Sequence, residues 1–296
     1  MKNLEKQFIK VSDIQLHVVM AGPEDGEPVV LLHGFPEFWY GWKKQISFLA
    51  EQGYRVIVPD QRGYNLSDKP DGVRHYDLDI LAQDIVNLAT VLGYDKINLV
   101  GHDWGAAVSW WVATLFPDKL KKLIILNVPY PTVMANQILE GNLAQLLKSW
   151  YMGFFQIPFL PETIAGLSDY SMMANAMQES ANPGSFSTED MNAYRRAWSQ
   201  PGAMTAMMNW YRAIARNPIE NDNHIERRIV TTTLMLWGEK DQFLGKELAE
   251  PSIQLCDDGE LIFYPDASHW LQHDEADSVN KEVHRFLQQS VTESVG

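Results

Sequence analysis

The residue best placed to do chemistry is an aspartate, Asp103, which stands in the segment Gly-His-Asp-Trp-Gly at residues 101–105. The segment follows an apolar run of strand length, residues 97–100, and precedes a helix-like stretch, residues 106–116. A sharp turn from a strand into a helix is strained and leaves no room for a Cβ atom on either side of the central residue, so glycine suits both flanking positions. The pattern therefore predicts a turn that presents Asp103 at the end of a strand. An aspartate that only caps the following helix is the plain alternative.

A carboxylate at such a turn implies a particular kind of nucleophilic chemistry. Its ordinary pKa is about 3.9, so it is ionised at neutral pH and needs no base to remove a proton. It attacks esters and amides poorly, but it can attack an sp³ carbon that bears a leaving group and form a covalent alkyl ester. Hydrolysis of that ester then needs a base that activates water and donors that stabilise the oxyanion. Asp103 therefore predicts an epoxide or an alkyl halide as substrate and argues against a serine-type esterase.

Short apolar runs alternate with helix-like segments along most of the chain, which predicts an α/β protein with a mostly parallel sheet and helices on both faces. The strand-like runs are residues 6–11, 14–19, 28–32, 55–59, 97–100, 121–127, 232–237 and 261–264. Ligands of such sheets bind at the carboxyl ends of the strands, where Asp103 is expected. Residues 132–220 lack this pattern and are rich in Met, Trp, Tyr and Phe. We therefore expect a core formed by residues 1–131 and 221–296, with residues 132–220 inserted as a helical cap.

Three further motifs strengthen the interpretation. His33-Gly34-Phe35-Pro36 follows an early strand-like run, and two different tyrosine motifs occur within residues 132–220, Tyr-Met-Gly-Phe-Phe-Gln at 151–156 and Asn-Trp-Tyr-Arg at 209–212. With Gly-His-Asp-Trp-Gly, these motifs make nearly the whole chain resemble the epoxide hydrolases of the α/β-hydrolase superfamily. The resemblance implies an α/β-hydrolase fold and an oxyanion hole made by the backbone N–H groups of Phe35 and Trp104, two residues that would also contact the substrate. We expect His33 itself to be structural and to brace the turn.

The resemblance also implies a base and an orienting acid later in the chain, in the order nucleophile, acid, histidine. Asp241 follows one strand-like run and matches the position of the acid, and His269 follows the last run and matches the base. The histidine would activate water, while the acid would fix its tautomer and stabilise the imidazolium. Glu239 and Asp266 are weaker alternatives for the acid, and His273 is the rival for the base.

Two tyrosines distinguish an epoxide from other substrates. An epoxide opens to an alkoxide, which needs a proton or a hydrogen bond, and a phenol of pKa about 10 can supply either. Tyr151, in Tyr-Met-Gly-Phe-Phe-Gln, and Tyr211, in Asn-Trp-Tyr-Arg, match the two cap motifs of the family. The resemblance therefore implies that both donate to the epoxide oxygen. The alternative is that both only pack within the cap.

Dehalogenases that share the aspartate nucleophile are the alternative activity. Haloalkane dehalogenases often pair the tryptophan after the nucleophile with an asparagine in the place that Phe35 holds here. Haloacetate dehalogenases place an arginine where this chain has Trp104. Both departures favour the epoxide hydrolase interpretation. A non-catalytic α/β-hydrolase that binds a small hydrophobic ligand is a third possibility.

Composition limits the partners. Of the 296 residues, 24 are Lys or Arg and 38 are Asp or Glu, and the net charge of −14 argues against nucleic acid and anionic membranes. The single cysteine, Cys256, excludes an intrachain disulfide, and the charged N-terminus lacks the apolar core of a signal peptide. No run reaches the roughly 18–20 apolar residues of a transmembrane helix. We expect a cytoplasmic protein without a cofactor, metal or membrane partner, whose ligands are a small hydrophobic epoxide and water.

Overall fold

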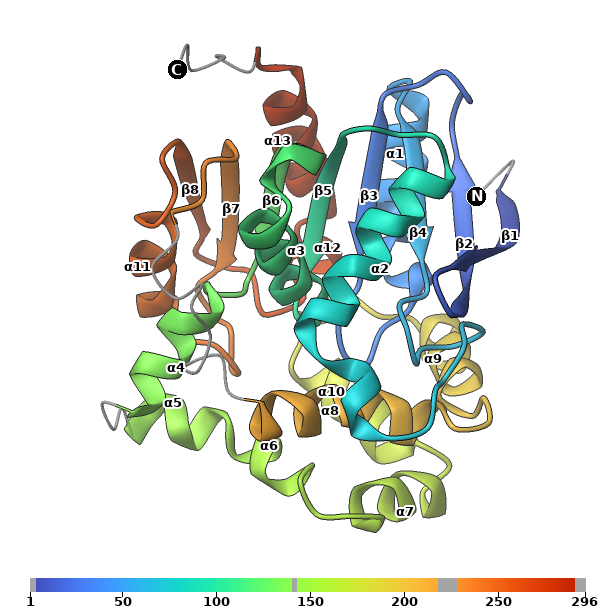
Figure 1. Cartoon of the computed structure of the whole chain (residues 1–296). Coiled ribbons are helices and arrows are strands. Elements are labelled where there is room, and N and C mark those ends of the chain that lie inside the picture. The colour runs from blue at the N-terminus through green and yellow to red at the C-terminus, as the bar shows by residue number, and fades with distance from the viewer. Residues whose placement is uncertain (1–3, 140–142, 218–227, 291–296) are drawn as a thin grey trace.

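One eight-stranded sheet forms the centre of the computed structural model, which describes residues 4–139, 143–217 and 228–290 (Figure 1). The strands are β1 (Glu5–Val11), β2 (Ile14–Ala21), β3 (Pro28–Leu32), β4 (Arg55–Pro59), β5 (Ile97–His102), β6 (Leu120–Leu126), β7 (Thr233–Gly238) and β8 (Gly259–Tyr264). Their order across the sheet is β1-β2-β4-β3-β5-β6-β7-β8. The β1–β2 and β2–β4 pairs are antiparallel, and the other pairs are parallel. The predicted α/β architecture with a mostly parallel sheet is therefore confirmed.

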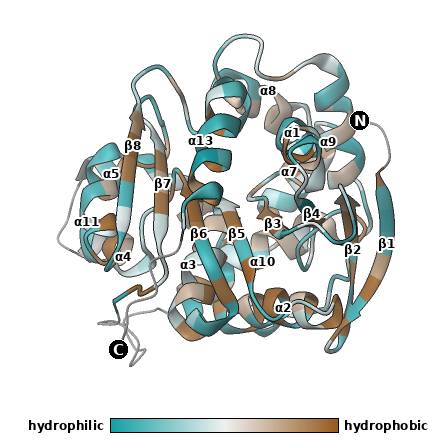
Figure 2. Cartoon of the chain, turned by 90° about the horizontal axis from the view of Figure 1, so that it is seen from above, coloured by the Kyte–Doolittle hydropathy of each residue, from teal (hydrophilic) through white to brown (hydrophobic). Residues whose placement is uncertain are grey.

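Helices cover both faces of this sheet. The helices of the core are α1 (Lys43–Glu51), α2 (Leu78–Val91), α3 (Trp104–Leu115), α11 (Ala249–Ile253), α12 (Leu271–Asp274) and α13 (Ala276–Gln288). Figure 2 shows α2 and α3 on one side of the sheet and α1 and α13 on the other. Every residue of β3, β4 and β5 is buried, because central parallel strands are covered on both faces. The continuous apolar runs seen in the sequence are the result.

The helix α2 illustrates how local sequence sets an element. Its apolar residues recur at helical spacing, and Leu81, Ile85 and Leu88 lie buried on one face. Gly93 follows the helix with φ 85°. This left-handed conformation commonly ends helices, and glycine adopts it without strain. The apolar spacing and this glycine together account for the extent of α2.

Seven helices stand between β6 and β7 in the described part of the chain. They are α4 (Pro131–Leu139), α5 (Leu143–Lys148), α6 (Trp150–Phe154), α7 (Leu160–Leu167), α8 (Ser171–Glu179), α9 (Thr188–Trp198) and α10 (Ala203–Arg216). They lie together at one end of the sheet (Figure 1). Residue 220, the expected end of the cap, lies outside the described residues. The exact division between core and cap therefore stays a prediction.

The cap helices are fixed to one another and to the core by polar contacts as well as by packing. The helix α9 begins with a capping box, in which the Ser187 hydroxyl accepts from Asp190 N–H and the Asp190 carboxylate accepts from Ser187 N–H. Tyr194 on the same helix donates to the buried Glu37 of the core.

None of the helices that the structure describes combines the length and apolar character needed to cross a lipid bilayer.

Candidate active site

Asp103 stands in a strained turn between β5 and α3. Its backbone adopts φ 50° and ψ −126°, a conformation that residues with a side chain rarely adopt. A Cβ atom at Gly101 would lie 2.4 Å from the Gly105 carbonyl oxygen, and one at Gly105 would lie 2.2 Å from that of Leu32. Both glycines are therefore required by close backbone approach, as the sequence pattern suggested. The Asp103 side chain makes no capping hydrogen bond to α3, so the capping alternative is wrong.

The two carboxylate oxygens of Asp103 face different partners. Oδ1 accepts a hydrogen bond of 2.5 Å from the backbone N–H of Phe35. Oδ2 lies 3.6 Å from His269 Nε2. Trp104 begins α3 directly after the turn, so the N-terminal end of this helix, which favours negative charge, lies at the carboxylate. The arrangement leaves Oδ1 with a backbone donor and Oδ2 beside an imidazole.

His269 and Asp241 form a buried pair behind Asp103. His269 Nδ1 lies 2.7 Å from Asp241 Oδ2, which also accepts from Asn127 Nδ2 at 2.9 Å. Asp241 Oδ1 accepts from the backbone N–H groups of Phe243 and Leu244 at 2.7 and 2.9 Å. The carboxylate is thus held by four donors and fixes the imidazole so that Nε2 faces Asp103. Three side chains that follow β5, β7 and β8 are brought together here.

Charge coupling shifts the titration of this pair. Burial opposes the charged imidazole, but the carboxylates of Asp241 and Asp103 outweigh it and raise the pKa of His269 to about 10. Burial also opposes ionisation of Asp241, but His269 and the hydrogen bonds from Asn127 and from the backbone lower the pKa of Asp241. At neutral pH His269 is therefore an imidazolium held against the ionised Asp241.

The alternative residues lie elsewhere. Glu239 and Asp266 pair with lysines, Lys246 and Lys240, and Asp266 is fully exposed. His273 is buried, and its Nε2 lies 2.7 Å from Glu37 Oε1. These contacts turn all three side chains away from Asp103. Of the acids and histidines that the sequence proposed, the structure brings only Asp241 and His269 to it.

A buried polar network supports the site, and the sequence analysis did not single out its members. Glu37 accepts hydrogen bonds from Gln272 Nε2 at 2.9 Å and from Tyr194 at 2.6 Å, besides its contact with His273. His102 Nε2 lies 2.8 Å from the backbone oxygen of His269. Burial opposes the charge of Glu37, but His273 and His102 hold the pKa of this carboxyl well below its usual range. The network ties the turn before Glu37, the strand that carries Asp103 and the loop that carries His269 to one another.

Asn127 and His33 hold the backbone around Asp103, Asp241 and His269. Asn127 has φ 54°, which asparagine tolerates, and its amide bridges Asp241 and the backbone N–H of Gly238. Its position directly after β6 was the only sequence signal for this role. His33 is buried, and its Nε2 accepts from the backbone N–H of Gln61 at 3.1 Å. His33 thus braces the turn, as expected.

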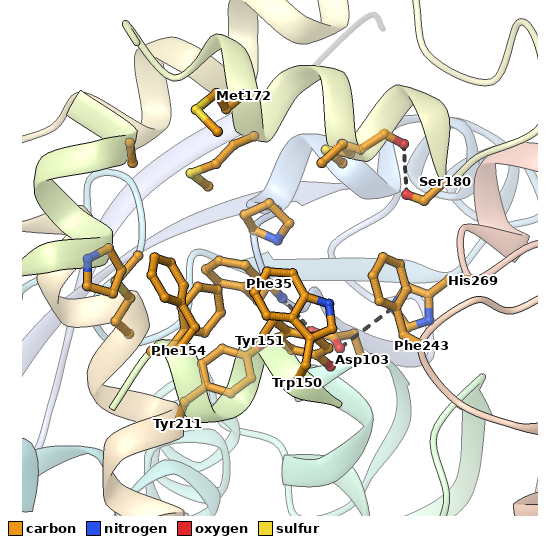
Figure 3. Close-up of a pocket in the computed structure, with 18 of the residues that line it drawn as sticks. Phe35, Asp103, Trp150, Tyr151, Phe154, Met172, Ser180, Tyr211, Phe243 and His269 are labelled. Atoms are coloured by element: carbon orange, nitrogen blue, oxygen red, sulfur yellow. Dashed lines mark hydrogen bonds and ion pairs between the residues drawn. The ribbon is translucent and has the colours of Figure 1, made fainter. Parts of the chain in front are cut away.

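Asp103 and His269 border an apolar cavity of about 290 Å³. The residues that line it include Phe35, Pro36, Phe154, Phe155, Ile164, Met173, Met177, Met208, Phe243 and Trp270. Met172 and Ser180 lie across the cavity from Asp103 (Figure 3). The Ser180 hydroxyl donates to a backbone oxygen and accepts from Trp270, so its polarity is satisfied by the protein. Asp103 and His269 are the charged groups among the described residues that line this space.

Tyr151 on α6 and Tyr211 on α10 line the same cavity. Their ring centroids are 6.0 Å apart, and the Tyr211 ring lies 5.0 Å from that of Trp104 and 5.3 Å from that of Phe35. Burial, and after it the negative charge of Asp103, raises the pKa of both phenols above the ordinary value. Both hydroxyls therefore keep their protons at neutral pH.

In the described part of the chain, no cluster of three or more His, Cys, Asp or Glu side chains has the arrangement of a metal site.

The fold and the site define an α/β-hydrolase with a carboxylate at the strand-to-helix turn. The family profile described as α/β-hydrolase fold matches residues 27–276. The AB hydrolase superfamily protein YfhM of Bacillus subtilis is 45% identical over 97% of this chain and 99% of that protein. Human epoxide hydrolase 4 is 41% identical over 95% of this chain and 78% of that protein.

Solved structures agree with these relatives. Epoxide hydrolase A from Mycobacterium thermoresistibile superposes with a TM-score of 0.85 at 27% identity, over 97% of this chain and 98% of that one. The Bacillus megaterium epoxide hydrolase in complex with an inhibitor gives a TM-score of 0.83 at 29% identity, over 96% and 100% of the two chains. The chain therefore belongs to the α/β-hydrolase fold family and, within it, to the epoxide hydrolases.

Proposed function

We propose that the protein hydrolyses small hydrophobic epoxides to vicinal diols through a covalent ester on Asp103. One observation carries the proposal: Asp103, Tyr151 and Tyr211 border the same apolar cavity, while His269 faces the carboxylate of Asp103 from within the core. A nucleophile, two proton donors and a base are thus available around one substrate-sized space. Human and nematode relatives named as epoxide hydrolases support the same activity.

In the first step, Asp103 opens the epoxide. Oδ1 is held by the Phe35 N–H, so Oδ2 is the oxygen free to attack an epoxide carbon. A bond forms between Oδ2 and that carbon while the ring C–O bond breaks, and its electron pair goes to the epoxide oxygen. One of the protonated hydroxyls of Tyr151 and Tyr211 gives its proton to this oxygen and becomes a tyrosinate, while the other donates a hydrogen bond to it. Asp103 becomes a neutral ester.

In the second step, water hydrolyses the ester. Esterification removes the negative charge of Asp103, one of the two carboxylates that raise the pKa of His269. The imidazolium then passes its proton, through solvent, to the tyrosinate that ring opening leaves, and the neutral imidazole becomes the base that takes a proton from water, with Asp241 stabilising the charge that returns. Negative charge develops on Oδ1, where the backbone N–H groups of Phe35 and Trp104 form the oxyanion hole; each donor of this kind contributes roughly 3–4 kcal/mol. Collapse releases the diol and restores Asp103.

The lining of the cavity indicates the class of substrate. Among the described residues, no lysine, arginine, asparagine or glutamine side chain borders it, so a charged or strongly polar substituent would lose its hydration without gaining a partner. We therefore expect neutral alkyl or aryl epoxides to be favoured. Water is the co-substrate, and no cofactor has a role in either step.

The direct test is product analysis with an aryl epoxide and, in parallel, a primary bromoalkane. We expect diol from the epoxide and no bromide release. Asp103→Ala should form no diol, which excludes a background reaction. Bromide without diol would contradict the proposal and would indicate a dehalogenase, in which the two tyrosines only fill the cap.

A further inference from the structure

Large apolar side chains are exposed mainly on one part of the cap. Eleven such side chains are exposed in the described residues, and seven of them lie between residues 147 and 172. The seven, which we call the cap apolar face, are Leu147, Trp150, Ile157, Phe159, Leu160, Leu167 and Met172. They come from α5, α6, the segment between α6 and α7, α7 itself and the start of α8, and α5 to α7 follow one another along the lower edge of the molecule in Figure 1. Soluble monomers rarely expose such a concentration without a binding role.

The same stretch contributes almost no free charge. Lys148 donates to the backbone oxygen of Asp241, and Glu162 forms a 2.7 Å ion pair with Arg212 that is largely buried. Asp169, at the far end of the stretch, is the exposed acid among its charged side chains. The segment is therefore close to neutral, although the whole chain carries a net charge of −14.

Phe159 is held in a strained conformation in which its ring stays in water. Its backbone has φ 64° and ψ −23°, in the left-handed region, and its side chain is 79% exposed. A bulky residue in this region is unusual and costs free energy. Leu167, the last residue of the helix α7 that follows Phe159, is 84% exposed. Neither residue lines the catalytic cavity, so their exposure is not explained by the reaction.

The catalytic cavity opens within this face. Trp150 and Met172 both line the cavity, yet they are 68% and 59% exposed. They therefore stand where the cavity meets solvent, on two different helices (Figure 3). An apolar molecule that entered between them would reach Asp103 without leaving an apolar environment.

We propose that the cap apolar face docks onto an electrically neutral lipid surface, such as a phosphatidylcholine bilayer. The near-neutral face avoids the cost of desolvating charge, whereas the acidic body of the protein would be repelled by anionic lipid. Tryptophan, present here at the cavity mouth, is a favoured side chain at membrane interfaces. A second copy of the chain fits less well, because it would close the mouth. The net charge of −14 disfavours binding to anionic membranes, but it does not oppose binding to an electrically neutral one.

Docking and catalysis are linked by the position of the mouth. Apolar epoxides dissolve in lipid, so a mouth that faces the lipid would receive substrate directly. This delivery rests on the proposed epoxide hydrolase function, but the docking itself does not.

Vesicle flotation of the full chain tests the docking. The probe is phosphatidylcholine vesicles, alone and with added phosphatidylserine. The test variant is Phe159→Asn with Leu167→Gln; asparagine tolerates the left-handed backbone, and neither residue touches the cavity. The matched control is Phe8→Asn with Val91→Gln, since these two residues are 57% and 58% exposed on β1 and α2.

We expect the wild type and the control variant to float with neutral vesicles, and the test variant to partition about tenfold less or weaker still. Added phosphatidylserine should weaken flotation of the wild type. Absence of flotation with neutral vesicles, or equal flotation of the test variant, would overturn the proposal. A dimer in sedimentation velocity that dissociates in the test variant would also overturn it, in favour of a second copy as the occupant. Flotation without diol formation would instead leave docking supported and the proposed function refuted.

Discussion

His269 Nε2 lies 3.6 Å from Asp103 Oδ2, closer to an ion-pair separation than to a hydrogen bond. The other ring nitrogen of His269 is held 2.7 Å from Asp241. The imidazole thus stands between two carboxylates, one permanent and one that the proposed reaction converts to a neutral ester. The charge of Asp103 therefore connects the two half-reactions, since its loss prepares His269 to act as a base.

This relationship predicts the effect of Asp103→Asn on the titration of His269. Removal of one nearby negative charge should lower the pKa of His269 from about 10, by about one unit or more. The imidazole would then become neutral at a lower pH. An NMR titration of the histidine ring signals measures the shift.

Asp266→Asn is the matched control, because this carboxylate is three residues before His269 but fully exposed and paired with Lys240. It should leave the pKa of His269 unchanged. If Asp103→Asn also leaves it unchanged, the coupling between Asp103 and His269 is absent.

Substitution of His269 and substitution of His273 should have opposite effects on hydrolysis of the ester. His269→Gln should still open the epoxide but should not hydrolyse the ester, because among the described residues no other imidazole lies within ion-pair distance of Asp103. The protein should then gain the mass of one substrate molecule, which intact-protein mass spectrometry detects. His273→Gln should keep turnover and should not accumulate the ester, since His273 contacts Glu37.

An oxygen label distinguishes this route from direct attack of water on the epoxide. In a single turnover in ¹⁸O-water with enzyme in excess, the label should enter the Asp103 carboxylate, because water attacks the ester carbonyl. The diol should carry oxygen from the protein. Label found in the diol and absent from the Asp103 peptide would contradict a covalent intermediate.

Several of these positions could be predicted from the sequence, because local patterns determine them. The apolar runs specify buried strands, and the glycines around Asp103 specify a turn with close backbone contacts. Asp241 and His269 each follow a strand, and parallel strands end at the same edge of a sheet. Asp103, Asp241 and His269 are far apart in the chain, but because each follows a strand their proximity could be predicted.

Other parts of the site depend on tertiary packing and left little local signal. Glu37 and His273 are 236 residues apart, and their contact exists only because the turn that carries Glu37 lies against α12, which carries His273. The cap apolar face likewise could not be predicted from local sequence. Phe155 and Phe159 are four residues apart in an aromatic-rich stretch, yet Phe155 packs 5.3 Å from Phe35 while Phe159 points into water. Composition could not distinguish them.

The two tyrosines should act in epoxide opening and not in ester hydrolysis. Tyr151→Phe or Tyr211→Phe should slow ester formation, and the double variant should lose roughly 10²–10⁴-fold, the usual contribution of acid catalysis. Rapid-mixing measurements with excess enzyme separate this step from hydrolysis. Tyr170→Phe is the control, since this cap tyrosine packs near Trp198 and does not line the cavity.

The pH dependence of ester formation gives a second test of the tyrosines. Because the pKa of each phenol is raised, each keeps its proton to higher pH than a free tyrosine. The rate of ester formation should therefore remain supported by protonated phenols up to a pH above about 10, the ordinary tyrosine value. A loss of this rate well below pH 10 that is absent from the double phenylalanine variant would contradict the raised pKa values.

Gly34 tests whether the position of Asp103 is set by backbone contact. A Cβ atom at Gly34 would lie 2.3 Å from both Cβ and Oδ1 of Asp103, so Gly34→Ala must displace either the carboxylate or the turn that carries the Phe35 N–H. Displacement of reacting groups by about 1 Å can cost about 100-fold in rate, and we expect a loss of this size in kcat. Gly153→Ala on α6 is the control, because its Cβ would meet nothing within 4 Å. A folded Gly34→Ala variant, verified by circular dichroism, that turns over at the wild-type rate would show that the contact between this turn and Asp103 does not position the nucleophile.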